Sequence, residues 1–354
     1  MIITTTGFFN TGSSAIIHVL KEFDAIYNQD EVYEVRFLYD PDCISDLEYH
    51  LIENPHRQNT SYAIQRFKKY IDYNTNPILN RHYEKICKGN FKKLSYQYID
   101  DISLFKYYGV SHIDTFDKSV LFCFLNRCYQ KVLRLFLGFG IKNRFKESLL
   151  SKKTVQYAGL FEKDRFISAT RKYVESVLRY FNPKCNDYFL IDQLVPPSNI
   201  SRYLNYLPDR YVRVFVVDRD PRDLYVTCKY FLNSKSIPVE NVDQFCDWFE
   251  WTRGQSRVNV DSEYVMRIQF EDLIYDYEAT RQRIIDFCGI QRLHCTKKRK
   301  IFKPENSINN TLVWLRFPES VNDVEYIKKR LHKYCYDFDS KEIKPNYAKK
   351  TFDC

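Results

Sequence analysis

The chain contains little glycine and no long apolar run. Only 9 of its 354 residues are Gly, whereas 29 are Tyr and 27 are Phe. No stretch of about 18 apolar residues occurs, which excludes an ordinary membrane-spanning helix. Hydrophobic residues make up 44% of the chain and charged residues 28%, a balance that excludes an intrinsically disordered protein. We therefore expect a soluble α/β protein with a large core.

The cysteines lack the spacing of a metal site or a redox pair. The 11 Cys residues include no Cys-x-x-Cys pair and no zinc-type spacing, and their number is odd. Apolar β-branched residues begin at position 2, so we expect no signal peptide. These features predict reduced thiols in a cytoplasmic protein. No obvious carboxylate metal site is present, and we expect no metal.

The net charge is positive. At +9, it favours an anionic partner, which could be a nucleotide, a polyanionic glycan, a nucleic acid or an anionic membrane surface.

The first 23 residues predict a strand, a tight turn and a helix. Residues 2–6 are β-branched throughout, as in a short buried strand, and apolar residues recur with helical spacing from Ala15 onward. Backbone N–H groups at such a turn bind phosphate or sulfate. We interpret this turn as an anion-binding loop, and the alternative is a capped surface helix after an edge strand. The loop consists of Gly7, Phe8, Phe9, Asn10, Thr11, Gly12, Ser13 and Ser14.

The loop resembles a Walker A motif but lacks its lysine. Two glycines are separated by four residues and followed by two hydroxyl residues, with Ser13 where the lysine would stand. A kinase or ATPase would lack the side chain that reaches the β- and γ-phosphates. The sequence therefore favours a different phosphorylated donor.

The second half of the chain alternates between strands and helices. Residues 188–192, 212–217 and 265–269 are apolar strand-like runs, and helical patterns follow near 199–207, 242–257 and 277–287. A further short strand is predicted over residues 31–38. Such alternation predicts a parallel sheet of the P-loop type, with helices on both faces and ligands at the carboxyl ends of the strands.

Residues 40–180 predict a large helical insertion. Aromatic and aliphatic residues recur there at three- and four-residue spacings. Residues 119–140 form an apolar stretch interrupted by Arg127, Lys131 and Arg134. This stretch is either a core helix of the insertion, which we favour, or a basic amphipathic helix on a bilayer surface.

Four motifs in this order resemble those of the sulfotransferase superfamily. The first loop is similar to the 5′-phosphosulfate loop of that family, and Arg219-Asp220-Pro221-Arg222-Asp223 is similar to its 3′-phosphate motif. Thr227 stands where the family has a serine, eight residues after the arginine. The last two motifs are Phe270-Glu271-Asp272-Leu273 and Phe287-Cys288-Gly289. The resemblance covers residues 1–25 and about 186–315, and residues 40–180 match no family motif.

The resemblance implies a donor and two anion sites. The donor would be 3′-phosphoadenosine 5′-phosphosulfate, and the product adenosine 3′,5′-diphosphate. The loop would hold the phosphosulfate, whereas Arg219 and Thr227 would hold the 3′-phosphate, because a guanidinium suits a phosphate monoester. The alternative for Arg219 is a surface salt bridge with Asp218, Asp220 or Asp223. In the family a C-terminal segment covers the donor, and we expect contacts from Lys303, Ser307 and Asn310 of this segment. Phe270 is also assigned to the donor site.

Two departures from the family pattern concern catalysis. Asn10 stands where many members carry a basic residue, so another cation (Arg36, Arg222 or Lys303) would have to stabilise the leaving phosphate. The strand ending at Asp192 lacks the histidine that serves as the base in relatives acting on small alcohols. We take Asp192 as the candidate base, although it is equally suited to cap the following helix. His18 is a reserve candidate.

We expect a single sulfotransferase-like domain that acts on a carbohydrate in a bacterial cytoplasm. Its core would be residues 1–38 and 186–315, its acceptor side the insertion at about 40–180, and its end a helix and tail at 316–354. Residues 297–300 are all basic, but we expect no nucleic-acid partner. Peripheral membrane contact is expected if the acceptor is lipid-linked. The alternatives are a nucleotide-binding protein that has lost its activity and, less favoured, a kinase.

Overall fold

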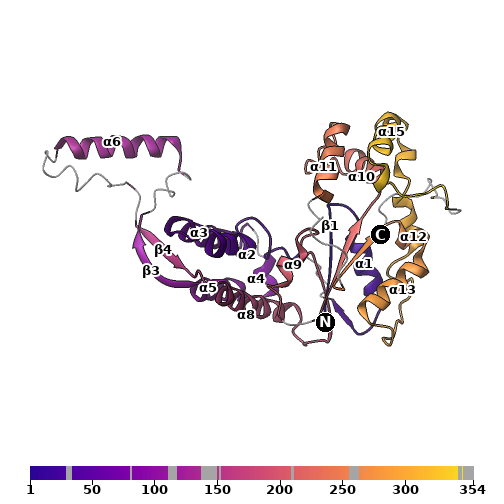
Figure 1. Ribbon diagram of the computed structural model, residues 1–354, viewed down its shortest axis with the longest axis horizontal. Coiled ribbons are helices and arrows are strands. Elements are labelled where there is room, and N and C mark those ends of the chain that lie inside the picture. The colour runs from indigo at the N-terminus through magenta and orange to yellow at the C-terminus, as the bar shows by residue number, and fades with distance from the viewer. Residues whose placement is uncertain are drawn as a thin grey trace. The chain divides into compact units, whose positions relative to one another are not determined.

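The computed structural model describes residues 1–28, 34–79, 82–110, 118–136, 150, 153–208, 211–254, 263–341 and 345 (Figure 1). The chain divides into two compact units, one of residues 1–38 and 178–354 and the other of residues 39–177. The predicted single domain with an insertion at about 40–180 stays a prediction, because two compact units fit either organisation.

The first unit is built on a five-stranded parallel sheet. Its strands lie in the order β2-β5-β1-β6-β7. Their bounds are β1 Ile2–Gly7, β2 Ile26–Asn28, β5 Tyr188–Asp192, β6 Val212–Asp218 and β7 Val265–Gln269. Ile2 is level with Phe189 on one side and with Val212 on the other, so β1 occupies the centre of the sheet. This confirms the predicted α/β class with a parallel sheet.

Helices of the first unit pack in two hydrophobic clusters. Apolar residues of β1, β5, β6 and β7 pack with those of α1, α12 and α13, whereas α10, α11 and α15 share a separate cluster. The helices are α1 Ser13–Leu20, α9 Ile200–Leu204, α10 Pro221–Val226, α11 Val242–Gly254, α12 Asp272–Tyr275, α13 Tyr277–Cys288, α14 Pro304–Ser307 and α15 Val321–Arg330. This packing fixes the loops that leave the carboxyl ends of β1, β5 and β6.

The strand predicted over residues 31–38 is wrong for the part that the structure describes. The strand of this region is β2, and residues 34–38 form no strand. Val35, Phe37 and Leu38 are nevertheless fully buried, and the backbone N–H of Val35 donates to the carbonyl of Asp192 (3.0 Å). The apolar alternation of residues 34–38 therefore reflects the burial of a loop beside β5. This loop does not form a β-ladder.

The second unit is mainly helical. Its helices are α2 Ile44–Glu48, continued as a π-helix over Tyr49–Glu53, α3 Arg57–Asn74, α4 His82–Ile86, α5 Phe91–Asp101 and α6 Val120–Phe136. Helix α8 (Lys163–Phe181) ends this region and continues into the first unit. An antiparallel hairpin of β3 (Ser103–Gly109) and β4 (Thr154–Gly159) was not predicted.

Helix α6 is not the core helix that the sequence favours. Leu121, Phe124 and Leu135 are 66%, 61% and 77% exposed. Helical periodicity shows that a helix has an apolar face, but not whether the protein covers that face. Residues 137–140 of the predicted stretch lie outside the described residues. Within the described ranges, no helix is both long enough and apolar enough to cross a membrane.

Candidate functional site: an anion-binding loop and a buried arginine

The loop after β1 has the backbone of an anion-binding turn. Phe9, Asn10 and Gly12 have positive φ angles of 78°, 52° and 88°. Left-handed residues in a tight turn help to direct successive backbone N–H groups toward one side, and helix α1 adds the partial positive charge of its N-terminus. No side chain caps this helix, so its first N–H groups remain suited to an external anion.

Two glycines are required by the packing of this loop. A Cβ atom on Gly7 would lie 2.2 Å from Thr11 Oγ1, and one on Gly12 would lie 2.6 Å from Cδ2 of Phe270. Thr11 cannot move aside easily, because its hydroxyl donates to the carbonyl of Val217 (2.7 Å) and accepts from the N–H of Phe8 (3.2 Å). The threonine thus ties the loop to β6, while Ser13 and Ser14 begin α1 and remain partly accessible.

Arg219 lies beside this loop. It follows β6, and its guanidinium Nη1 donates to the carbonyl of Asn10 (3.5 Å). Nη2 donates to Thr227 Oγ1 (3.2 Å) and to the carbonyl of Asn310 (2.6 Å), and Cζ lies 5.5 Å from the ring centre of Phe270. Five residues that the sequence assigned to donor binding are therefore in one place.

Among the described residues no carboxylate bonds directly to Arg219, although its charge interacts with the nearby buried carboxyls of Asp223 and Glu271. The side chain is only 4% exposed, and within the described part of the chain it takes part in no ion pair and its Nε has no hydrogen-bond partner. Its hydrogen bonds go to two carbonyls and a hydroxyl. Because an unpaired buried charge is costly, this arrangement is expected of a site whose counter-ion is a ligand.

The three carboxylates that might have paired with Arg219 have other partners. Asp218 pairs with Arg253 (2.5 Å), and Asp220 pairs with Arg222 (2.7 Å). Asp223 accepts from the backbone N–H groups of Leu312 and Val313 (2.9 and 2.6 Å). The surface salt bridge considered as an alternative for Arg219 is therefore not formed.

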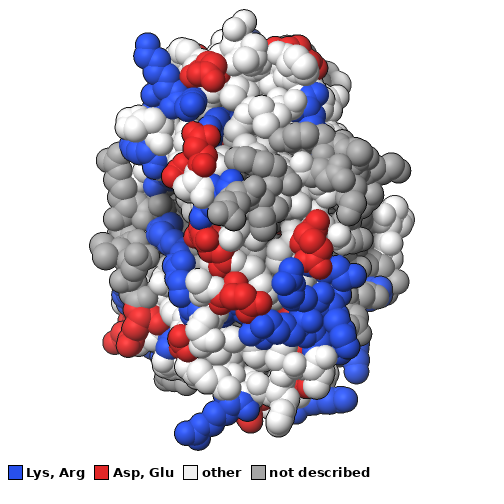
Figure 2. All heavy atoms as spheres, turned by 90° about the vertical axis from the view of Figure 1, so that its right-hand side faces the viewer, with Lys and Arg blue, Asp and Glu red and all other residues white. Residues whose placement is uncertain are grey.

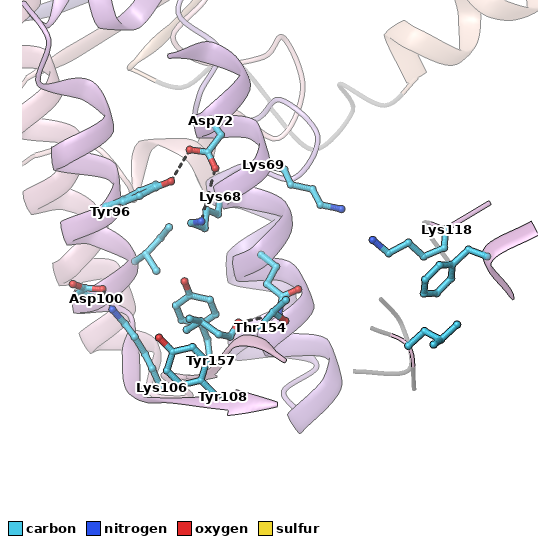
Figure 3. A pocket seen from close by; sticks show the side chains of 15 residues that line it. Lys68, Lys69, Asp72, Tyr96, Asp100, Lys106, Tyr108, Lys118, Thr154 and Tyr157 are labelled. Atoms are coloured by element: carbon cyan, nitrogen blue, oxygen red, sulfur yellow. Dashed lines mark hydrogen bonds and ion pairs between the residues drawn. The ribbon is translucent and has the colours of Figure 1, made fainter. Parts of the chain in front are cut away.

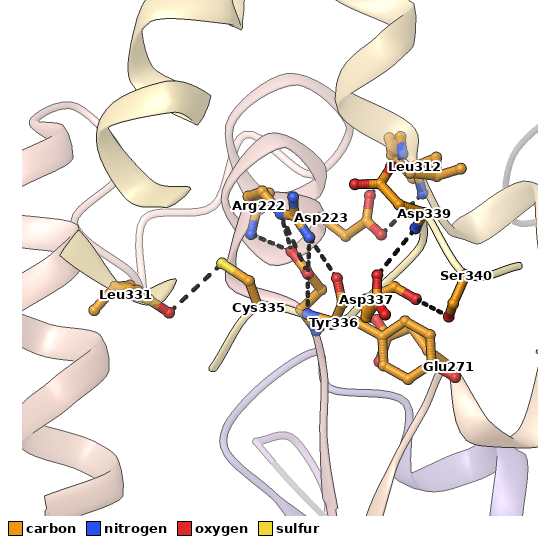
Figure 4. A network of polar contacts seen from close by, with 12 residues as sticks. Arg222, Asp223, Glu271, Leu312, Leu331, Cys335, Tyr336, Asp337, Asp339 and Ser340 are labelled. Atoms are coloured by element: carbon orange, nitrogen blue, oxygen red, sulfur yellow. Dashed lines mark hydrogen bonds and ion pairs between the residues drawn. The ribbon is translucent and has the colours of Figure 1, made fainter. Parts of the chain in front are cut away.

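A network of polar contacts surrounds Arg222, which follows Arg219 closely in the chain (Figure 4). Asp220 caps α10 and also accepts from the N–H of Tyr336 (2.7 Å), while the guanidinium of Arg222 donates to the carbonyl of Tyr336 (2.9 Å). Burial raises the pKa of Asp223 and that of Glu271, whose Oε1 accepts from the N–H of Asp220 (3.0 Å). A raised pKa favours the neutral carboxyl, which reduces repulsion of an anion bound at Arg219.

Asp192 ends β5 opposite Thr5 of the central strand. The Thr5 hydroxyl donates to Asp192 Oδ1 (2.6 Å). Burial, assisted by the charge of Glu34, raises the pKa of the Asp192 carboxyl to about 6, even though the Thr5 hydrogen bond lowers it. Asp192 caps no helix, because the next one, α9, begins at Ile200 and has Asn199 as its N-cap. The carboxylate is thus available as a proton acceptor.

The remaining sequence candidates lie farther from these contacts. His18 is in the last turn of α1, at the end opposite the loop, where burial lowers its pKa. Lys303 precedes α14 and is exposed, and Ser307 ends this helix. Lys303 and Ser307 are linked to the site through the sequence, because α14 leads directly into the short turn that carries Asn310.

Two of the three proposed replacements for the missing loop cation are paired with carboxylates. Arg36 pairs with Glu34 (3.3 Å), and Arg222 with Asp220; the third, Lys303, is exposed. A further arginine, Arg253 of α11, lies next to the loop with its Cζ 4.4 Å from the ring centre of Phe8, although it too is paired, with Asp218. Sequence reasoning missed Arg253, because it lies outside every motif and only the fold brings α11 to Asp218.

The second unit contains a cavity of about 910 Å³ (Figure 3). Tyr96, Tyr108 and Tyr157 line it together with several lysines, which include Lys68 and Lys106. Lys106 pairs with Asp100, and Asp72 accepts from the Tyr96 hydroxyl (2.5 Å). The lining thus combines aromatic rings with positive charges, a combination suited to a polar ligand with flat apolar faces and acidic groups.

The basic run at residues 297–300 is a surface feature. All four side chains are exposed, and Lys298 and Arg299 pair with Glu278 and Glu305 (2.8 and 3.0 Å). Figure 2 shows one face of the molecule, on which Lys and Arg side chains form one larger group and are otherwise interspersed with Asp and Glu. The described residues contain no group of three His, Cys, Asp or Glu side chains able to hold a metal ion.

Comparisons with known proteins found two similar solved structures. No protein-family model and no curated protein matches the sequence. The structure is similar to the sulfotransferase STF9 from Mycobacterium avium, with 12% identity and a TM-score of 0.36, over 97% of this chain and 77% of that one. It is also similar to the sulfotransferase STF1 from Mycobacterium tuberculosis H37Rv, with 13% identity and a TM-score of 0.31, over 94% and 76%. With TM-scores this low, the function of this chain must be argued from its own residues.

We predict that Gly12→Ala destabilises the protein more than Gly289→Ala does. Both glycines have positive φ angles (88° and 64°), which cost other residues about 1–2 kcal/mol. Only at Gly12 would the new methyl group meet a side chain, since nothing lies within 4 Å at Gly289, and overpacking adds about 1–3 kcal/mol. Urea unfolding measures the difference. Equal losses of unfolding free energy would contradict the close contact between Gly12 and Phe270.

Proposed function

We propose that this protein is a sulfotransferase that uses 3′-phosphoadenosine 5′-phosphosulfate as its donor. The observation that carries the proposal is the buried, unpaired guanidinium of Arg219, which contacts both Thr227 and the loop carbonyl of Asn10. Together with the loop, it offers two adjacent anion sites, as a nucleotide with a 3′-phosphate and a 5′-phosphosulfate requires.

In this proposal, the two anion sites hold the donor while its sulfuryl group is transferred. The backbone N–H groups of the loop and the hydroxyls of Ser13 and Ser14 bind the 5′-phosphosulfate, and Arg219 with Thr227 binds the 3′-phosphate. An acceptor oxygen attacks sulfur, the bond from sulfur to the bridging phosphate oxygen breaks, and adenosine 3′,5′-diphosphate leaves. Such a reaction depends mainly on alignment and on stabilising the leaving charge. The amide of Asn10, which donates to Cys228 Sγ (3.7 Å) in the structure, would turn to donate to the bridging oxygen.

Asp192 takes the proton of the acceptor hydroxyl. It lies at the carboxyl end of β5, the strand next to the loop-bearing β1, and the pKa of about 6 suits a base that works near neutral pH. The Thr5 hydroxyl orients its carboxylate. His18 is less suited, because it lies in the last turn of α1.

The acceptor is proposed to be a carbohydrate bound by residues 39–177, in a bacterial cytoplasm. Support comes from the carboxylate base and from the cavity of this unit, which combines tyrosines with lysines. Aromatic rings stack on the apolar faces of sugars, whereas lysines attract acidic substituents. The acceptor would accordingly be a glycan with acidic groups.

Binding of adenosine 3′,5′-diphosphate tests the donor site. We expect Arg219→Ala to weaken it by roughly 100-fold, since a buried charge contact of this kind is worth about 2–5 kcal/mol. AMP, which lacks the 3′-phosphate, should bind weakly to both forms, and calorimetry measures all four affinities. Arg283→Ala is the control, because it also removes an arginine. The Arg283 side chain is half exposed, and its contact with Asp272 is long, at 4.0 Å. Equal affinity for AMP and the diphosphate would refute the proposed donor.

A base with a pKa near 6 predicts one acidic limb in the pH profile. The turnover rate should fall as the pH drops below about 6, because protonated Asp192 cannot accept a proton. Asp192→Asn should lower kcat by about 10²–10⁴ and abolish that limb, while diphosphate binding is retained. The matched control is Asp187→Asn, on an exposed residue just before the same strand. If tight diphosphate binding occurs without turnover on any acceptor, the chain is a nucleotide-binding protein without transferase activity.

Loss of a cavity tyrosine tests the acceptor assignment. Tyr108 is 75% exposed and lines the cavity, so Tyr108→Ala should fold normally and raise the acceptor KM by about tenfold, the effect of losing one aromatic contact. The donor KM should not change. Tyr73→Ala, on an exposed tyrosine of α3 outside the cavity, should alter neither. Kinetics with a panel of acidic glycans provide the measurement, and an unchanged acceptor KM would place the glycan elsewhere.

A further inference from the structure

Helix α6 turns its apolar face away from the protein. On a helical wheel, Leu121, Phe124, Leu125, Val132 and Leu135 fall within one half of the circumference. Each of these five side chains is between 49% and 77% exposed. A surface helix normally buries this half against the core, so the orientation of α6 is the reverse of the usual one.

The opposite side of α6 is the less exposed one. Asn126 lies on the opposite half of the wheel and is only 8% exposed. Its Oδ1 accepts from the backbone N–H of Leu150 (2.8 Å). Asn126 is held by this hydrogen bond, while the apolar side has no cover in the described part of the chain. The exposed surface is therefore a consequence of how the helix is attached.

The basic charge of the chain is concentrated in the same stretch. Residues 118–153 contain nine Lys or Arg and a single acidic residue, Glu147, which gives a net charge of +8. The whole chain has a net charge of +9, so the remaining 318 residues are nearly neutral. On α6 itself, Arg127 and Lys131 are exposed beside the apolar half, and the helix contains no Asp or Glu.

We propose that α6 docks on an anionic lipid bilayer. Its apolar half would enter the boundary between headgroups and acyl chains, and Arg127 and Lys131 would lie at the level of the lipid phosphates. The charge decides between possible occupants, because the exposed Lys118, Arg127 and Lys131 are not balanced by any acidic residue of α6. They complement a uniformly negative surface, whereas a helix groove in a protein would not require them. The proposal does not depend on sulfuryl transfer, and vesicle binding can be measured without it.

Vesicle binding by the full chain tests the proposal. Phe124→Trp introduces a reporter on the exposed half, and its emission should shift to shorter wavelength with vesicles containing about one third phosphatidylglycerol. Pure phosphatidylcholine vesicles should give a much smaller shift, and added salt should reverse the binding. Flotation of the unmodified chain with both kinds of vesicle provides an independent readout.

Two double variants separate the apolar and the charged contributions. Leu121→Ser with Leu135→Ser should abolish flotation, and Arg127→Gln with Lys131→Gln should weaken binding to anionic vesicles by about 10- to 30-fold. The matched controls lie in the first unit. They are Trp251→Ser with Leu315→Ser, which removes exposed apolar side chains, and Lys297→Gln with Lys298→Gln, which removes exposed charges. Neither control should change vesicle binding.

Three results would overturn the proposal. One is the absence of flotation with anionic vesicles, and another is equal binding to neutral vesicles. The third is an apolar-face variant that converts an oligomer into a monomer in light scattering while no vesicle binding occurs. That result would assign the exposed half of α6 to a second copy of the chain.

Discussion

The buried charge of Arg219 is the constraint on which the site depends. Fixing a guanidinium in the interior without a carboxylate partner is unfavourable unless the surroundings supply many oriented oxygens. Here those oxygens come from three distant segments, Asn10, Thr227 and Asn310. Each of the three neighbouring aspartates bonds to another donor and forms no ion pair with Arg219, and we propose that a ligand supplies the missing counter-ion. The same contacts join the first loop, the segment after β6 and the C-terminal segment into one structure.

The sequence predicts this part of the fold well because local chemistry determines it. A β-branched run followed by two glycines specifies a strand and a turn, and Asp220 before Pro221 specifies the start of α10. Parallel strands bring their carboxyl ends to one edge. Consequently, the loop, Asp192 and Arg219 could be expected near each other, although their roles in binding and catalysis remain proposals.

Other features depend on packing that a single sequence does not reveal. The β3–β4 hairpin joins segments about 50 residues apart within a region of helical periodicity. Val35 and Phe37 are buried although they lie in a loop, and their alternating pattern resembles that of a strand. Arg253 reaches Phe8 only because α11 packs next to β6. For α6, periodicity predicts the apolar face correctly, but its outward orientation depends on where the polar side is attached.

The position of β1 also constrains how this protein is made. The first strand of the chain is the central strand of the sheet, and both of its neighbours, β5 and β6, come from residues beyond 187. During synthesis, residues 2–7 leave the ribosome well before β5 and β6 and cannot pair until those strands have followed. Such long-range pairing slows folding and leaves an apolar strand unpaired for a long period. Chaperone contact with the unpaired β1 is therefore an expected requirement, and the loop that follows β1 reaches its final shape only after β6 has been made.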